Sequence, residues 1–76
     1  MKELLKMIAK SLVDEPQGVV VEESKTDYGT VLKLKVAPDD MGKIIGRQGK
    51  RAKALRTIMK AVSFRNNTNV TLEIVD

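Results

Sequence analysis

The sequence contains no cysteine and no histidine. The lack of cysteine excludes disulfide bonds and thiolate metal sites, and the lack of histidine removes the commonest general base of enzymes. We recognise neither paired carboxylates beside an apolar cleft nor a nucleotide-binding glycine loop. We therefore expect no catalytic residue, no bound metal, no cofactor and no small-molecule substrate, and we predict that the protein is not an enzyme.

Aromatic residues and long apolar runs are also scarce. Tyr28 and Phe64 are the only aromatic residues, which argues against a binding surface built from several stacking aromatic side chains. Tyr28 falls in a turn, where we expect it to pack, and Phe64 falls at a helix end, where it borders the core or contacts a partner. No apolar run approaches the roughly 20 residues that span a membrane, and no export signal is recognisable. We expect a soluble intracellular protein without membrane association.

Positive charge is what the sequence has in excess. Its 76 residues, enough for a single domain over 1–76, are 42% apolar and 32% charged, with a net charge of +4. The distribution is uneven, because the stretch Met41–Leu72 contains no Asp or Glu and carries +8, which leaves −4 on the rest. A basic stretch of this kind favours a polyanionic partner, chiefly nucleic acid.

Hydrophobic periodicity and turn residues predict the order of helices and strands. Pro16 and Gly18 break the chain after a first amphipathic helix, and a turn over Thr26–Gly29 predicts a hairpin. We predict helices over Glu3–Val13, Asp40–Ile45 and Lys50–Phe64, and strands over Val19–Lys25, Thr30–Ala37 and Asn69–Val75. This α-β-β-α-α-β order predicts an α+β fold, in which three helices cover one face of a three-stranded mixed sheet.

The ends and faces of the helices give further expectations. Pro38 followed by Asp39 and Asp40 is a helix-start signal, in which either carboxylate can cap the first free amides. Four apolar residues of the long helix share the face expected to enter the core: Leu55, Ile58, Met59 and Val62. The opposite face is basic, and we expect it to be a solvated surface that raises the local potential: Lys53, Arg56 and Lys60.

The segment Gly46-Arg47-Gln48-Gly49 joins the short helix to the long one inside the basic stretch. Glycine has no Cβ, so a phosphate-bearing strand can approach the main chain closely. The segment leads into the N-terminus of the long helix, where free amides and the helix dipole attract anions. Because Arg47 and Lys50 add cations at the same place, we predict a clamp for a sugar-phosphate backbone beside a groove that holds the bases.

With its flanks, this segment resembles a known signature. The run Gly42-Lys43-Ile44-Ile45-Gly46-Arg47-Gln48-Gly49-Lys50 is similar to the KH domain motif, an apolar pair before a GxxG loop that clamps about four nucleotides. The element order resembles the type II, prokaryotic arrangement. The resemblance covers essentially the whole chain and extends to small stand-alone bacterial members through Val36-Ala37-Pro38 and Ala54-Leu55-Arg56-Thr57. It implies a cytoplasmic RNA-binding protein that forms a homodimer, or a heterodimer with a larger KH-containing protein.

The charge and the resemblance together select the candidate RNA-binding residues. The clamp and its nearest cation come first: Gly46, Arg47, Gln48, Gly49 and Lys50. Lys43 precedes the apolar pair and is a candidate for the groove's flank, whereas Arg51 either lines the groove or extends from the core edge. One of Ile44 and Ile45 should pack inward while the other supports the bases, and the sequence leaves open which.

The function hypothesis is a single-stranded RNA-binding protein that acts as a post-transcriptional regulator or RNA chaperone. The alternative is a module that docks another protein or the ribosome, in which RNA contact is secondary. Single-stranded DNA as the ligand is a weaker variant of the first hypothesis. A single small site implies weak binding, so pairing with a second copy or a larger partner would raise the affinity through effective concentration.

Overall fold

A computed structural model of the chain describes residues 2–75. The helices are α1 (Lys2–Leu12), α2 (Met41–Ile45) and α3 (Lys50–Arg65), and the strands are β1 (Val20–Thr26), β2 (Gly29–Lys35) and β3 (Val70–Val75). Single 3-10 turns lie at Pro16–Gly18 (η1), Pro38–Asp40 (η2) and Arg47–Gly49 (η3). The predicted order is confirmed, and each bound differs from the expected one by no more than two residues.

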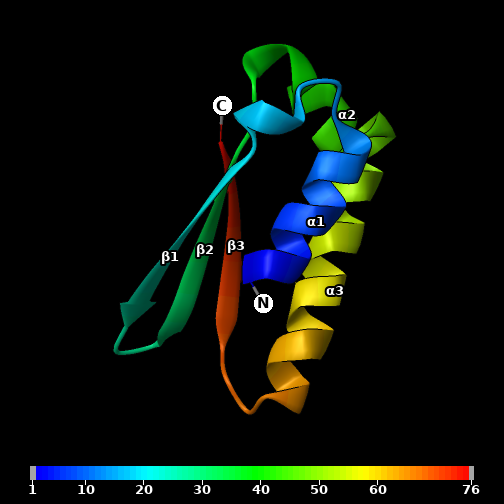
Figure 1. The fold of residues 1–76 in the computed structure, drawn as a ribbon. Coiled ribbons are helices and arrows are strands. Elements are labelled where there is room, and N and C mark those ends of the chain that lie inside the picture. Colours follow the sequence, from blue (N-terminus) through cyan, green and yellow to red (C-terminus); the bar gives the residue numbers. More distant parts are fainter. Residues whose placement is uncertain (1, 76) are drawn as a thin grey trace.

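The three helices lie over one face of the sheet (Figure 1). The strand order is β1-β2-β3, with β1 antiparallel to β2 and β2 parallel to β3, so the expected mixed sheet is confirmed. The α2–α3 segment is the crossover that returns the chain to a parallel strand. Within residues 2–75, β3 is therefore an edge strand that pairs with β2 alone, and α3 runs along it (Figure 1).

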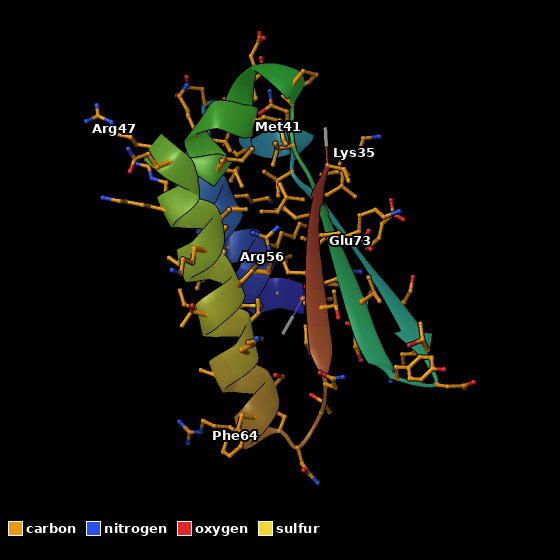
Figure 2. The ribbon with its side chains drawn as sticks, turned by 180° about the vertical axis from the view of Figure 1, so that it is seen from behind. Lys35, Met41, Arg47, Arg56, Phe64 and Glu73 are labelled. Carbon is orange, nitrogen blue, oxygen red and sulfur yellow. The ribbon has the colours of Figure 1, made fainter. Side chains whose placement is uncertain are left out.

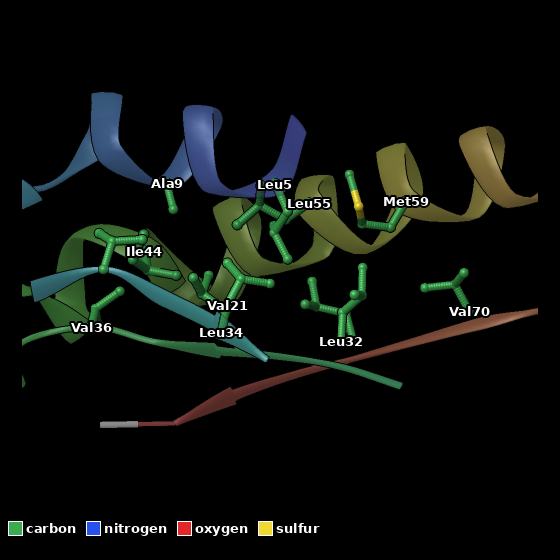
Figure 3. Packing of buried hydrophobic residues seen from close by; sticks show 12 residues of the cluster. Leu5, Ala9, Val21, Leu32, Leu34, Val36, Ile44, Leu55, Met59 and Val70 are labelled. Atoms are coloured by element: carbon green, nitrogen blue, oxygen red, sulfur yellow. The ribbon is translucent and has the colours of Figure 1, made fainter. Parts of the chain in front are cut away.

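The core lies between the sheet and the helices (Figure 3). Leu32 and Leu34 alternate with exposed lysines along β2, and both leucines are fully buried. They pack with side chains from all three helices, chiefly Leu5, Ala9, Ile44, Leu55 and Met59. The core thus fixes where α2 and α3 stand relative to the sheet.

The expected inner face of α3 is partly wrong. Leu55 and Met59 are buried as expected, but Ile58 is 39% exposed, and Ala52 and Ser63 are buried in its place. The reason is the position of the sheet, because α3 turns the side of Ala52, Met59 and Ser63 toward the core. Ile58 therefore lies outside the core, on the exposed side of α3.

The expected role of Asp40 as a helix cap is also wrong. No side-chain hydrogen bond from Asp39 or Asp40 caps η2 or α2. Instead, the carboxylate of Asp40, which is 2% exposed, accepts the backbone amides of Asp14 at 3.3 Å and Glu15 at 3.1 Å. Asp40 therefore ties the loop after α1 to the start of α2.

Candidate nucleic-acid interface

The corner Gly46–Gly49 is a strained turn between α2 and α3. Gly46 ends α2 with φ 77° and ψ 176°, its amide donating to the carbonyl of Gly42 at 2.9 Å. Gln48 (φ 56°) and Gly49 (φ 75°) are left-handed, and the amide of Gly49 donates back to the carbonyl of Gly46 at 3.2 Å. Backbone angles of this kind are unfavourable for side chains other than glycine, and they concentrate at functional sites.

The two glycines of the corner face different surroundings. A Cβ on Gly46 would lie 2.8 Å from Cγ and 3.0 Å from the backbone nitrogen of Arg51, so this glycine allows the corner to pack against α3. A Cβ on Gly49 would meet nothing within 4 Å. The sequence predicts that both glycines admit the phosphate-bearing strand. The structure gives them different surroundings, because only Gly49 opens onto free space.

The side chains of the corner point into solvent. Arg47, Gln48 and Lys50 are exposed, and Arg47 projects away from the body of the protein (Figure 2). Within residues 2–75, no side-chain hydrogen bond or ion pair involves any of the three. The first turn of α3 begins directly behind them, and its leading amides have no partner within the helix. Two cations and a helix N-terminus therefore meet at one exposed place.

The structure decides between the two isoleucines. Ile44 is fully buried in the core, whereas Ile45 is 37% exposed. Two further apolar side chains of α2 and α3, Met41 and Ala52, are half-buried and buried respectively. Ile45 is thus the apolar side chain next to the corner that remains available to a ligand.

Lys43 and Arg51 each bond another residue of the chain at the protein surface. The ammonium of Lys43 bonds the carboxylate of Asp14 and lies 3.7 Å from Oδ1 of Asp40. The hydrogen bond to Asp14, followed by the attraction of the two carboxylates, raises the pKa of Lys43 above its ordinary value. The guanidinium of Arg51 donates to the carbonyl of Lys43 at 2.8 Å. Both cations therefore brace α2, and a contact of either with RNA stays a prediction.

A shallow hollow lies between α3 and the edge strand β3. Its volume is about 160 Å³, and it is lined by Arg56, Met59, Lys60, Val70, Thr71 and Leu72. Figure 2 shows Arg56 on the side of α3 that faces β3. The sequence predicts that Arg56 and Lys60 form a solvated face that raises the local potential. Helical spacing cannot reveal a strand that packs beside that face, so the groove residues became visible only in the fold.

Across residues 2–75, no group of three or more His, Cys, Asp or Glu side chains is placed to hold a metal ion. No helix in the same range is long and apolar enough to cross a membrane.

The topology and the corner between α2 and α3 define the class of protein as a type II KH domain. Solved structures of similar fold include an Era variant from Aquifex aeolicus bound to GDP.AlF4-, with a TM-score of 0.60 and 22% identity. A second is Era in complex with MgGDPNP and a segment of 16S ribosomal RNA, with a TM-score of 0.53 and 24% identity. Each match covers 96% of this chain and 28% of the Era chain, so the likeness shows the fold alone.

Sequence comparison identifies the family. The family model described as "KhpA/KhpB, KH domain" matches residues 2–74. Relatives named RNA-binding protein KhpA are 52% identical in Clostridium perfringens, 53% in Clostridium acetobutylicum and 45% in Listeria monocytogenes. The matches cover 99%, 99% and 100% of this chain and 100% of each relative. The chain therefore belongs to the KhpA/KhpB family of KH domains, and the resemblance to stand-alone KH proteins is confirmed.

Proposed function

We propose that this protein binds single-stranded RNA, with the corner Gly46–Gly49 holding the sugar-phosphate backbone and the α3–β3 hollow holding bases. The observation that carries the proposal is the strained, exposed corner whose cations, Arg47 and Lys50, have no partner within residues 2–75. The relatives named RNA-binding protein KhpA support it. The protein acts by binding and not by catalysis.

The backbone of the RNA approaches over Gly49, on the open side of the corner. The amide of Lys50 donates to the carbonyl of Arg47, so the amides that follow it in the first turn of α3 face the phosphates together with the charges of Arg47 and Lys50. Gln48 hydrogen-bonds the sugar or phosphate oxygens. A KH clamp holds about four nucleotides. If three or four phosphates are neutralised, the logarithm of affinity falls with the logarithm of salt concentration with a slope of about −2 to −3.

The bases lie along the groove between α3 and β3. Met59 and Val70 at the floor of the hollow are buried in the core, and the exposed side chains of Arg56 and Lys60 offer positive charge along one wall. The other wall is β3, whose outer edge has backbone donors and acceptors that no strand uses. Base edges can pair with such groups, so a groove poor in aromatic residues is adequate for binding.

The clamp is tested by replacing Arg47 and Gln48 together with aspartate. Both side chains are exposed, so the variant should fold, and the added negative charge should abolish binding to short single-stranded RNA. A matched control, Lys2→Asp with Ser11→Asp, makes the same change in net charge on exposed positions of α1. RNA binding that survives in the folded corner variant would refute the clamp. Loss of RNA binding in both variants would show that net charge alone, and not the corner, governs binding.

We further propose that the protein works in the cytoplasm as a post-transcriptional regulator or RNA chaperone. One shallow groove and one corner bind RNA weakly, which suits a protein that must release its ligand. Comparison of matched RNA and single-stranded DNA oligonucleotides tests the preference for RNA. Crosslinking in cells, with the double aspartate variant as control, identifies the bound transcripts.

A second candidate function is pairing with another KH-containing chain, either a second copy or a larger protein. The exposed apolar side chains of α3 favour it, since Phe64 is 86% exposed and Ile58 39% exposed. The expectation that Phe64 borders the core is therefore wrong, and its partner-surface alternative remains. Replacement of Phe64 with serine should lower the sedimentation coefficient of an oligomer without changing the fold. An association that persists after nuclease treatment and in the corner variant would show that pairing does not depend on RNA.

A further inference from the structure

Tyr28 lies in the turn between β1 and β2, at the end of the molecule opposite α2 (Figure 1). Its side chain is 87% exposed, so the expected packing against the turn is wrong. The backbone of Tyr28 is nevertheless held firmly. Its amide donates to Oγ1 of Thr26 at 3.1 Å, and its carbonyl accepts from Nδ2 of Asn69 at 2.9 Å. The turn thus presents a free aromatic ring from a fixed main chain.

The surroundings of Tyr28 connect it to the α3–β3 groove. An open hollow of about 440 Å³ lies between the hairpin tip and the loop before β3, and Tyr28, Asn67 and Asn69 line it. A second hollow of about 220 Å³ is lined by Tyr28, Asn69 and Thr71. Thr71 also lines the hollow between α3 and β3. Thr71 is exposed between the buried Val70 and Leu72, so a ligand that leaves the groove and crosses the edge strand β3 at Thr71 reaches the hollow beside Tyr28.

The chemistry of the tip suits a nucleobase better than a phosphate. A phenol ring stacks on any base, and side-chain amides supply both donors and acceptors for base edges. The charged residues in the lining are Lys25 and Asp27, one of each sign, so the tip lacks the excess of cations found at the corner. The two ends of the groove thus differ in chemistry. The corner presents cations and an open glycine, whereas the hairpin tip presents an aromatic ring and side-chain amides.

We propose that Tyr28 stacks on a nucleobase of the RNA strand that the corner holds, at the point where this strand leaves the groove beside Thr71. The inference rests on the proposed function and adds a base site outside the groove. Because the corner and groove hold about four nucleotides, the stacked base lies beyond that tetranucleotide. RNA longer than a tetranucleotide therefore binds more tightly, because its additional base stacks on Tyr28.

The experiment compares binding of random-sequence tetranucleotide and octanucleotide RNA pools to the wild type and to two variants. Tyr28→Ala should weaken octanucleotide binding about tenfold, as expected for the loss of one stacked base, and change tetranucleotide binding less than about twofold. Tyr28→Phe keeps the ring and should match the wild type with both pools. The exposure of Tyr28 ensures that neither variant disturbs the core.

A direct readout is available because Tyr28 is the only tyrosine. Incorporation of 3-fluorotyrosine gives a single ¹⁹F resonance, which should shift on addition of the octanucleotide pool and stay unchanged with the tetranucleotide pool. An unmoved resonance at saturation with octanucleotides overturns the inference. An equal loss of affinity for both pools in Tyr28→Ala also overturns the inference.

The corner variant separates the two proposals. If Arg47→Asp with Gln48→Asp abolishes binding while Tyr28→Ala binds octanucleotides as the wild type does, the stacking site is refuted and the clamp stands. If the corner variant binds like the wild type, the proposed function fails whatever Tyr28 does. Failure of the wild type to bind either pool would refute both.

Discussion

Two neighbouring parts of the α2 region are built in opposite ways. The corner Gly46–Gly49 has a strained backbone and exposed side chains without partners in the described chain. The acidic junction, which we define as Asp14, Asp40 and Lys43, contains a buried carboxylate whose oxygens accept two amides and face an ammonium. A helix of five residues such as α2 cannot hold its own shape. The bonds of the acidic junction therefore hold α2 in place, so the corner that follows α2 can stay free of side-chain contacts.

The same contrast separates two cations of the basic stretch. Lys43 bonds Asp14, within the junction, whereas Arg47 extends freely from the corner. The charge of +8 on Met41–Leu72 consequently overstates the charge that a phosphate can meet. A basic residue in a binding motif is therefore a phosphate contact only if no carboxylate of the protein already pairs with it.

The largest expected effect separates the two glycines of the corner. Gly46→Ala should cost about 3 kcal/mol of unfolding free energy, because the new Cβ enters the space of Arg51 and the backbone angles suit only glycine. Gly49→Ala should cost about 1 kcal/mol, since only its left-handed φ opposes the methyl group. Urea denaturation followed by circular dichroism measures both, and equal losses would contradict the packing argument.

The acidic junction should be the next most sensitive place. Asp40→Ala leaves the amides of Asp14 and Glu15 without their acceptor and should cost about 2 kcal/mol. Asp39→Ala is the matched control, because the neighbouring carboxylate is exposed and should matter by less than about 0.5 kcal/mol. A larger loss in Asp39→Ala than in Asp40→Ala would restore the capping role that the sequence predicted.

The two cations of the α2 region should differ in their effect on RNA binding. Arg47→Met should reduce the magnitude of the salt slope by about 0.7, the value for one phosphate contact on a single strand. Lys43→Met should reduce it less, since Asp14 already neutralises this ammonium. Titrations at several salt concentrations measure the slopes. Identical slopes for the two variants would mean that RNA displaces Asp14 and that Lys43 acts as the resemblance to KH domains implies.

The smallest effect is the pH dependence of the junction. The hydrogen bond to Asp14 raises the pKa of Lys43 in the folded protein above that in the unfolded chain, so its contribution to stability is complete at neutral pH. That contribution is lost as the pH rises past the ordinary lysine value of about 10.4 and through the higher folded value. Between about pH 10 and 12, Lys43→Met should therefore lose less stability than the wild type. Lys10→Met, an exposed position on α1, should keep the wild-type slope.

Much of the fold and the centre of the candidate site could be predicted from the sequence. The helices and strands follow from periodicity within single segments, and the corner follows from two glycines that flank Arg47 and Gln48. The KH resemblance depended on the same short-range pattern, and the family match confirmed it. These features act over a few neighbouring residues, so the sequence displays them directly.

The sequence by itself thus determined the order of elements, the glycine corner and the family. Only the tertiary structure decided which isoleucine is buried, which partners Asp40 has, and that Arg56 and Lys60 line a groove. It also decided that Tyr28 stands free beside the loop before β3. The physical reason is that each of these depends on segments distant in sequence that the core brings together, and side-chain spacing along one element carries no record of its neighbours.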